Sequence, residues 1–189
     1  MSGKVKFLIA AGLALAVSSV SYGQNLNSTA ANVTLNATLA ESLTVSTTVT
    51  TLPITLVAGG VSTATTPFTI NTAWVLKSGA GRGNVQVVSY LGSSTAALTD
   101  GSGDNIPASA VSGQINGAGG FSAYTGGASN GIGLAAATLP IGTTAITSAN
   151  RNGSRSDTLS LKVDLSTGSL PQLPAASYTG TLSLQAVAY

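Results

Sequence analysis

Apolar and polar residues alternate along most of this chain with a period of two. Near the N-terminus, for example, Asn and Thr are interleaved with Val33, Leu35, Ala37 and Leu39. This period places an apolar row on one face of a β-strand and polar groups on the other face. Helical spacing is almost absent, and we expect at most a short helical piece at 135–137. The pattern therefore predicts a protein built from β-strands.

The segments with β-strand composition are short and are separated by turns rich in Gly, Asn and Ser. The predicted strands are 33–39, 43–49, 54–57, 68–76, 85–91, 108–115, 145–147, 158–165 and 178–189. Many short strands with glycine-rich turns, and no alternation of strands with helices, are typical of antiparallel sandwiches and barrels. We therefore predict an all-β, antiparallel fold.

The first 23 residues have the features of a secretory signal peptide. Lys4 and Lys6 form a basic start, residues 7–17 form an apolar run, and small residues occupy positions 21 and 23. The apolar run is too short for a typical membrane-spanning helix. We predict export and cleavage after Gly23, so that the only association with the membrane is through this export signal.

Cleavage leaves a neutral chain of one domain and a short extension. We predict an N-terminal extension or first strand at 24–40 and a sandwich domain at 41–189. The exported part contains five basic and five acidic residues, namely Lys77, Arg82, Arg151, Arg155, Lys162, Glu41, Asp100, Asp104, Asp157 and Asp164. The overall pI of about 9.1 therefore owes much to Lys4 and Lys6, and it gives no support for binding nucleic acid.

The residue types that most enzymes use are missing or scattered. The chain has no Cys and no His, which excludes disulfides, thiolate metal sites and the commonest pairs of nucleophile and base. Asp157 and Asp164 lie seven positions apart on one predicted strand, so they should face opposite sides. We predict a protein that is not an enzyme and that carries no cofactor.

Two polar clusters have both a binding interpretation and a structural one. Asp100, Asp104 and Asn105 supply three side-chain oxygens on a glycine-rich loop that suits Ca²⁺, although a solvated hairpin turn is the favoured interpretation. Arg151, Arg155 and Asp157 precede the strand predicted at 158–165, where an arginine fork could bind a sugar acid or a phosphate. The favoured interpretation is that Arg155 and Asp157 pair across a turn at the surface. A phosphate-like loop at 79–83 is followed by a strand instead of a helix and is interpreted as a hairpin turn.

The two ends of the exported chain carry the strongest indication of function. The chain stops inside a predicted strand that includes Tyr178, Leu182, Leu184 and Tyr189, and its N-terminal extension leads directly into the alternating run at 33–39. Such an arrangement is suited to the exchange of strands between copies.

Residues 37–45 and the closing pattern Leu-Pro-Ala-Ala-Ser-Tyr-Thr-Gly-Thr-Leu at 173–182 resemble the spore coat protein U-like group, on the pilin side of the chaperone-usher proteins. The resemblance implies an incomplete immunoglobulin-like β-sandwich whose gap is filled by the N-terminal extension of the next subunit. Val33, Leu35, Ala37 and Leu39 would then be the donor side chains, and 178–189 the strand at the acceptor edge. A periplasmic chaperone and an usher are the implied partners. Many such subunits carry a disulfide, which this chain cannot form.

The leading hypothesis is a non-enzymatic structural or adhesive protein of the bacterial surface, exported through the periplasm and assembling by strand exchange. A second hypothesis is a secreted carbohydrate-binding module in which Trp74, Tyr90, Phe121 or Tyr124 would stack on sugar rings, although a lone Trp inside a strand is more often a core residue. A third is a small outer-membrane barrel, although the chain lacks recurrent aromatic girdles. Residues 33–39 either insert into another copy or form the first strand of their own domain.

Overall fold

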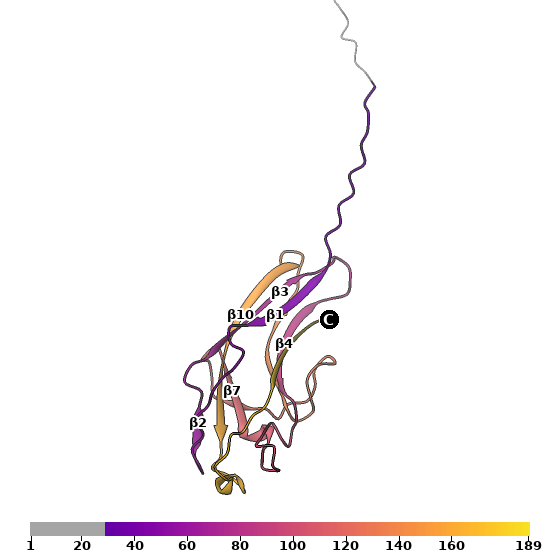
Figure 1. Cartoon of the computed structure of the whole chain (residues 1–189). Helices are drawn as coiled ribbons and strands as arrows, with labels where there is room; N and C mark the ends of the chain where they lie inside the picture. The colour runs from indigo at the N-terminus through magenta and orange to yellow at the C-terminus, as the bar shows by residue number, and fades with distance from the viewer. Residues whose placement is uncertain (1–28) are drawn as a thin grey trace, which may run out of the picture. The chain divides into compact units, whose positions relative to one another are not determined.

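The computed structural model describes residues 29–189 (Figure 1). Residues Leu39–Tyr189 form one compact unit, close to the predicted domain start at residue 41. Residues 29–38 belong to a separate unit, are solvent-exposed and are assigned to no strand. The predicted signal peptide at 1–23 lies outside the described residues.

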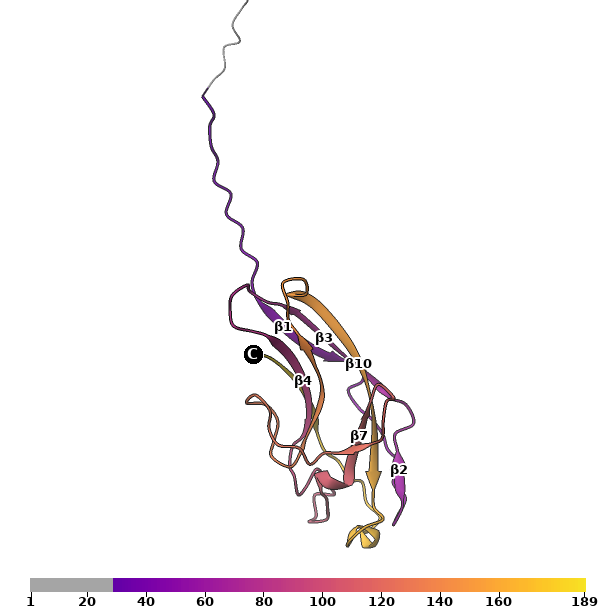
Figure 2. The same cartoon turned by 180° about the vertical axis from the view of Figure 1, so that it is seen from behind.

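The larger sheet is antiparallel and has six strands. Its path is β1 (Ser42–Thr47), β3 (Phe68–Val75), β10 (Asn152–Asp164), β7 (Val111–Ile115) and β8 (Ser122–Ala123), and β2 (Val61–Thr63) pairs with the end of β10. Figure 2 shows β1, β3 and β10 side by side. Strand β1 therefore forms one edge of this sheet.

The smaller sheet has three antiparallel strands in the order β11 (Leu182–Ala188), β4 (Asn84–Leu91) and β9 (Thr138–Ala145). A separate hairpin joins β5 (Leu98–Thr99) to β6 (Asn105–Ile106). The helical content consists of two 3₁₀ turns, η1 (Ala108–Ala110) and η2 (Leu170–Gln172), within the described residues. The predicted all-β, antiparallel sandwich is confirmed.

The two-residue alternation places the core between the two sheets. Along the second half of β10, every second side chain is buried, from Asp157 through Leu159, Leu161 and Val163. The three apolar side chains of this row meet apolar residues of the smaller sheet in one large cluster. Burying side chains of this size contributes about 1.5–3 kcal/mol each, so this cluster is the main source of stability.

A second, smaller cluster closes one end of the sandwich. Trp74, Leu76 and Val85 form its buried centre, and Leu43 and Ala188 pack against it. The Trp74 side chain is 3% exposed, and its Nε1–H donates a hydrogen bond to the Asn150 carbonyl at 2.8 Å. The prediction that Trp74 is a core residue is confirmed.

Arg155 and Asp157 do pair, but not across a surface turn. Both belong to β10, two residues apart on one face, and Arg155 Nε and Nη2 lie 2.7 and 2.6 Å from the two Asp157 carboxylate oxygens. The Asp157 side chain is 2% exposed. Arg155 Nη1 also donates to Thr144 Oγ1 on β9 at 3.1 Å, so this partly buried ion pair joins the two sheets. Asp164 lies on the opposite face of β10, as predicted.

Several predicted elements have different limits in the structure. The strand expected at 158–165 begins at Asn152, and the first residues of 108–115 form η1. Of the strand expected at 145–147, only Ala145 is in a strand, as the last residue of β9. The helical piece expected at 135–137 is a turn, because Ala136 has a φ of 56°. The loop at 79–83 is not a hairpin turn, since it joins β3 of one sheet to β4 of the other.

The Asp157 carboxylate should make the fold sensitive to acid. Burial of the carboxylate raises its pKa, but the hydrogen bonds from Arg155 and Asn116 together lower the pKa by more. The pKa therefore lies below its ordinary value of 3.8. A lowered pKa in the folded state means that the stabilisation is present above pH 3.8 and is lost as the pH falls through the folded-state pKa. The free energy of unfolding, measured by urea denaturation, should therefore fall steeply below pH 4.

The substitution Asp157→Asn should lower the free energy of unfolding at pH 7 by about 1.5–3 kcal/mol, because it removes the charge-assisted hydrogen bonds between the carboxylate and the Arg155 guanidinium. It should also flatten the acid dependence. Asp164→Asn on the outer face of the same strand is the matched control. This variant should retain most of the stability at pH 7 and most of its dependence on acid. An Asp157→Asn variant as stable as the parent chain at pH 7 would contradict this account of the ion pair.

Candidate functional site

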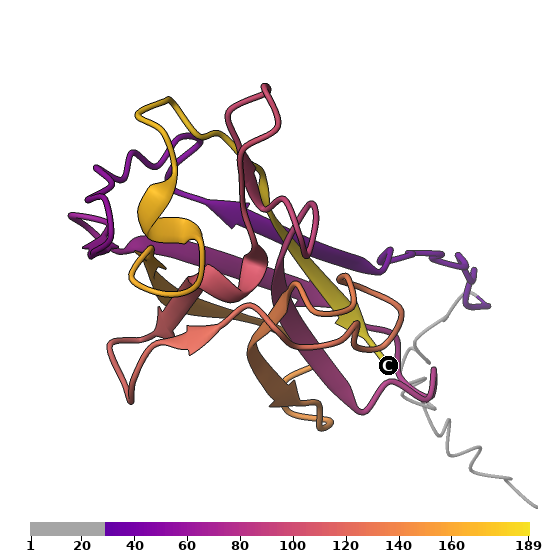
Figure 3. The ribbon, with the colours of Figure 1, turned by 90° about the horizontal axis from the view of Figure 1, so that it is seen from below.

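Two edge strands from different sheets meet along one side of the sandwich. The C-terminal strand β11, yellow in Figure 3, lies beside the indigo β1. Within residues 29–189, β1 pairs only with β3 and β11 pairs only with β4. Each strand therefore has one edge without a partner in the described chain, and an edge of this kind can accept a further strand.

Beyond the end of β1 the two edges separate and enclose a groove of about 430 Å³. One wall is formed by residues 47–54 and the other by residues 178–184. Its apolar lining consists of Val49, Leu52, Ile54, Phe68, Leu91, Leu98, Val111, Leu161, Val163, Tyr178, Leu182 and Leu184. Five of these are buried core residues, and the others are half-buried around the opening. The groove therefore opens directly onto the main hydrophobic core.

The first wall has the side-chain pattern of a strand but lacks strand pairing. From Leu52 to Leu56 the side chains are alternately half-buried and exposed, as in a strand that covers a core. No backbone hydrogen bond joins residues 50–56 to another part of the described chain. Backbone N–H and C=O groups without protein partners are satisfied only by water or by another chain. The strand predicted at 54–57 is therefore not formed, and this segment has no strand partner within the described chain.

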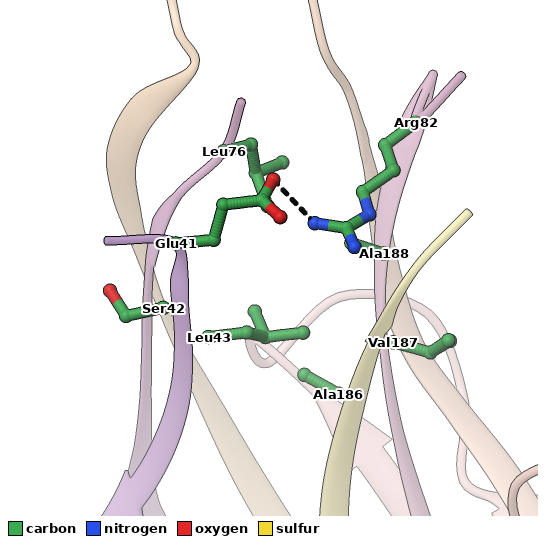
Figure 4. A pocket seen from close by; sticks show the side chains of 8 residues that line it. All are labelled: Glu41, Ser42, Leu43, Leu76, Arg82, Ala186, Val187 and Ala188. Carbon is green, nitrogen blue, oxygen red and sulfur yellow. Dashed lines mark hydrogen bonds and ion pairs between the residues drawn. The ribbon is translucent and has the colours of Figure 1, made fainter. Parts of the chain in front are cut away.

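We call the line along which β1 and β11 lie side by side the seam. The end of the seam opposite the groove is closed by an ion pair, shown in Figure 4. Glu41 Oε1 accepts hydrogen bonds from the Lys77 backbone N–H at 2.6 Å and from Arg82 Nη1 at 2.5 Å. The hydrogen bond from Lys77 is the largest cause of a lowered Glu41 pKa, and Arg82 lowers it further. We call Glu41, Arg82 and the Lys77 N–H the clasp. Beneath the clasp, Leu43 of β1 faces Ala186 and Ala188 of β11 across a small cleft.

The β5–β6 hairpin supports the other end of the groove. Thr99 and Thr179 exchange two backbone hydrogen bonds, each of 2.9 Å, and the Tyr178 hydroxyl donates to the Pro174 carbonyl at 3.0 Å. Partial burial raises the Tyr178 pKa, and the nearby Asp104 and Asp100 charges raise it further.

The loop of this hairpin contains the candidate calcium ligands. Asp100 Oδ1 accepts three backbone N–H groups, from Ser102, Gly103 and Asp104, and the Asn105 amide donates to the Gly103 carbonyl. This is the hydrogen bonding of a tight hairpin turn, which was the favoured interpretation. No group of three or more His, Cys, Asp or Glu side chains placed to hold a metal ion occurs in the part of the chain that the structure covers.

The predicted acceptor residues divide into two groups. Tyr178, Leu182 and Leu184 line the groove. Tyr189 does not, and it instead exchanges backbone hydrogen bonds with Asn84 near the closed end of the seam. Neither the wall at 47–54 nor the groove floor is among the residues that the sequence predicts for the site. The signal for the wall was present in the alternation at 52–56, whereas the floor residues resemble any other core positions.

The predicted donor residues are strongly exposed in the single chain. The exposed fractions are 82% for Val33, 89% for Leu35 and 79% for Leu39, and Ala37 is also exposed. Since residues 29–40 are assigned to no strand, they are not the domain's own first strand in this structure. A contiguous row of large exposed apolar side chains is uncommon on folded proteins, whereas single exposed apolar residues are normal.

The aromatic side chains do not form an open platform. Trp74 and Tyr124 are buried, and the Tyr124 hydroxyl lies 2.9 Å from Ser89 Oγ. Tyr90 and Phe121 are half-buried, and Lys162 covers the ring of Phe121. Sugar stacking requires accessible aromatic faces, so these positions favour a structural role.

No protein-family model matches the chain, and a search of curated proteins finds no significant match. None of the helical turns within residues 29–189 has the length and hydropathy required to cross a membrane. The groove and the exposed run at 33–39 are therefore the features from which function must be inferred.

Gly180 should be required for the shape of the groove wall. A Cβ atom at this position would collide with the Ala97 carbonyl oxygen and approach the Leu98 side chain at 2.9 Å. Gly180→Ala should therefore push residues 178–181 away from the β5–β6 hairpin and lower stability by about 1–3 kcal/mol, the usual range for overpacking.

Thermal unfolding and amide exchange at Thr179 are the measurements for this prediction, because the Thr99–Thr179 hydrogen bonds should be weakened. Gly92→Ala is the matched control, since a Cβ there meets nothing within 4 Å. Equal stability and equal Thr179 protection in both variants would show that the close approach at Gly180 is unimportant.

Proposed function

We propose that this chain is a non-enzymatic structural protein of the bacterial surface that polymerises by strand exchange. In this proposal, residues 33–39 of one copy enter the groove of the next copy and lie between residues 49–54 and β11. The observation that carries the proposal is an apolar groove bordered by residues 50–56, which have no backbone partners, and by β11, which has a strand partner on one edge only. The resemblance to the spore coat protein U-like and chaperone-usher pilin group remains part of the proposal.

The dimensions of groove and donor support a strand as the ligand. Residues 178–184 form one wall, and a strand of seven residues spans about 20 Å at 3.3 Å per residue. The apolar run from Val33 to Leu39 also has seven residues. An added strand would give hydrogen-bond partners to both walls at once, which a compact ligand would not do.

Hydrophobic burial supplies the association energy. Placing Val33, Leu35, Ala37 and Leu39 over the groove floor would contribute on the order of 6–10 kcal/mol before the cost of ordering the extension. The neutral charge of the exported chain supports repeated stacking, because identical subunits would repel each other weakly. A periplasmic chaperone and an usher are proposed partners, because an edge that accepts a strand from a neighbour can also accept one from a chaperone.

Deleting residues 24–39 should abolish polymers, because it removes the whole donor run. Negative-stain microscopy and size-exclusion chromatography of the exported chain, with and without these residues, test the proposal. Filaments formed by the deletion variant would refute it.

A single substitution in the donor should have the same effect as the deletion. Leu35→Asp would place a charge over an apolar floor, where an unpaired carboxylate is strongly unfavourable, and we expect polymer yield to fall more than about tenfold. Thr34→Asp introduces the same charge on the adjacent, polar side of the run and should leave most polymer intact. Equal losses from both substitutions would indicate a general effect of charge and not strand insertion.

The acceptor can be tested with a matched pair of substitutions on β11. Leu184 lines the groove, whereas the neighbouring Gln185 is exposed on the other face. Leu184→Arg should block the groove and yield monomers, and Gln185→Arg should polymerise like the parent chain. Circular dichroism would confirm that both variants fold. Polymerisation by a folded Leu184→Arg variant would argue against this groove as the acceptor.

A further inference from the structure

Strand exchange between copies requires that each chain's own extension does not fill its own groove. The extension is covalently joined to β1, which forms one side of the same seam. A donor on the same chain has a high effective concentration, on the order of millimolar for a short flexible connection. An extension that fitted its own groove would therefore outcompete neighbouring copies. The following inference rests on the proposed function and concerns what prevents this.

The spacing between the apolar run and β1 opposes closure within one chain. Only Ala40 and Glu41 separate Leu39 from the start of β1. A fold-back at this point would be a two-residue hairpin that pairs Leu39 with Ser42, and the same register would pair Val33 with Thr48. The apolar run would then lie beside β1, where Leu43 already faces Ala186 and Ala188 across the closed end of the seam.

The same register would bring an unsuitable segment to the groove. The wall at 49–54 would face residues 27–32, whose sequence is Asn-Ser-Thr-Ala-Ala-Asn. Placing Asn, Ser and Thr side chains over the apolar floor would leave polar groups buried without partners, which is unfavourable. The donor run is therefore about six residues out of register with its own groove, whereas the run of another copy has no such restriction.

The clasp opposes the fold-back at its turn. A two-residue hairpin requires positive φ values that Gly, Asn and Asp adopt readily and that Ala and Glu disfavour. In addition, the Glu41 side chain is tied to the Lys77 N–H and to Arg82 at the end of the seam. Releasing this side chain would allow the first residues of β1 to detach and would lengthen the free extension.

We propose that the short spacing at Ala40 and Glu41, together with the clasp, excludes the extension from its own groove and so directs the groove to a second copy of this chain. Glu41 and Arg82 are positioning residues in this account, since neither lines the groove.

Two insertion variants of the exported chain test the spacing. A flexible Gly-Ser segment of about twelve residues, which is long enough to span the length of β1, is inserted either between Leu39 and Ala40 or between Asn32 and Val33. The two variants have identical composition, but only the first lengthens the connection between the apolar run and β1. Sedimentation velocity and limited proteolysis of the extension are measured across a range of protein concentrations.

We expect the Leu39/Ala40 insertion to give monomers with a protease-protected extension at every concentration. The Asn32/Val33 insertion should polymerise like the parent chain. Equal polymerisation by both insertions, or a protected extension in dilute parent monomers, would overturn the inference and leave strand exchange intact. If the parent chain and both variants stay monomeric with an accessible extension, the proposed function fails, and the inference fails with it.

The contribution of the clasp is tested without an insertion. The double variant Glu41→Ala, Arg82→Ala should raise the fraction of monomers with a protected extension roughly twofold to fivefold, in keeping with the modest strength of an exposed ion pair. Asp104→Asn removes a charge at the far hairpin and is the control. An unchanged monomer fraction in the double variant would remove the clasp from the proposal.

Discussion

The organisation of this domain depends on a sheet edge that the described chain does not complete. Strand β11 pairs with β4 on one side only, and the segment at 50–56 has side chains on the core but no backbone partners. Backbone polar groups and an apolar floor both need to be covered. An added strand would satisfy both requirements at once. The groove is therefore a better candidate for the functional site than any cluster of polar side chains.

The rest of the fold holds this groove open by fixing the two sheets elsewhere. The Trp74 cluster closes one end of the sandwich, and the Arg155–Asp157 pair joins β10 to β9 within the interior. The β5–β6 hairpin supports the wall that contains Thr179. These contacts lie outside the gap between residues 47–54 and 178–184, which stays lined by the apolar core.

Much of the fold could be predicted because period-two alternation is a local signal. The central strands β3 and β4 were found within one residue at each end, and Trp74 was placed in the core. Pairing between distant segments could not be predicted in the same way. The segment at 54–57 has the alternation of a strand, but whether it has a neighbour depends on residues far away in the chain. The Arg155–Asp157 pair was expected at the surface because nothing in the local sequence reveals that β10 begins at Asn152 and directs both side chains inward.

The candidate site was predicted in part for the same reason. The donor run is an alternating segment that can be recognised locally, as can Leu182 and Leu184. The floor of the groove combines residues from β3, β4, β7 and β10, and only the packing of two sheets brings these together. Tyr189 was expected at the acceptor edge because it ends the strand predicted at 178–189, but its backbone bonds to Asn84 place it at the closed end of the seam.

Amide hydrogen exchange of the assembled protein, compared with that of dispersed chains, tests the central claim most directly. The account predicts that assembly protects three segments together, namely the run at 33–39, the wall at 50–56 and the amides of β11 that do not pair with β4. Polymers in which these three segments exchange as fast as in the single chain would contradict it.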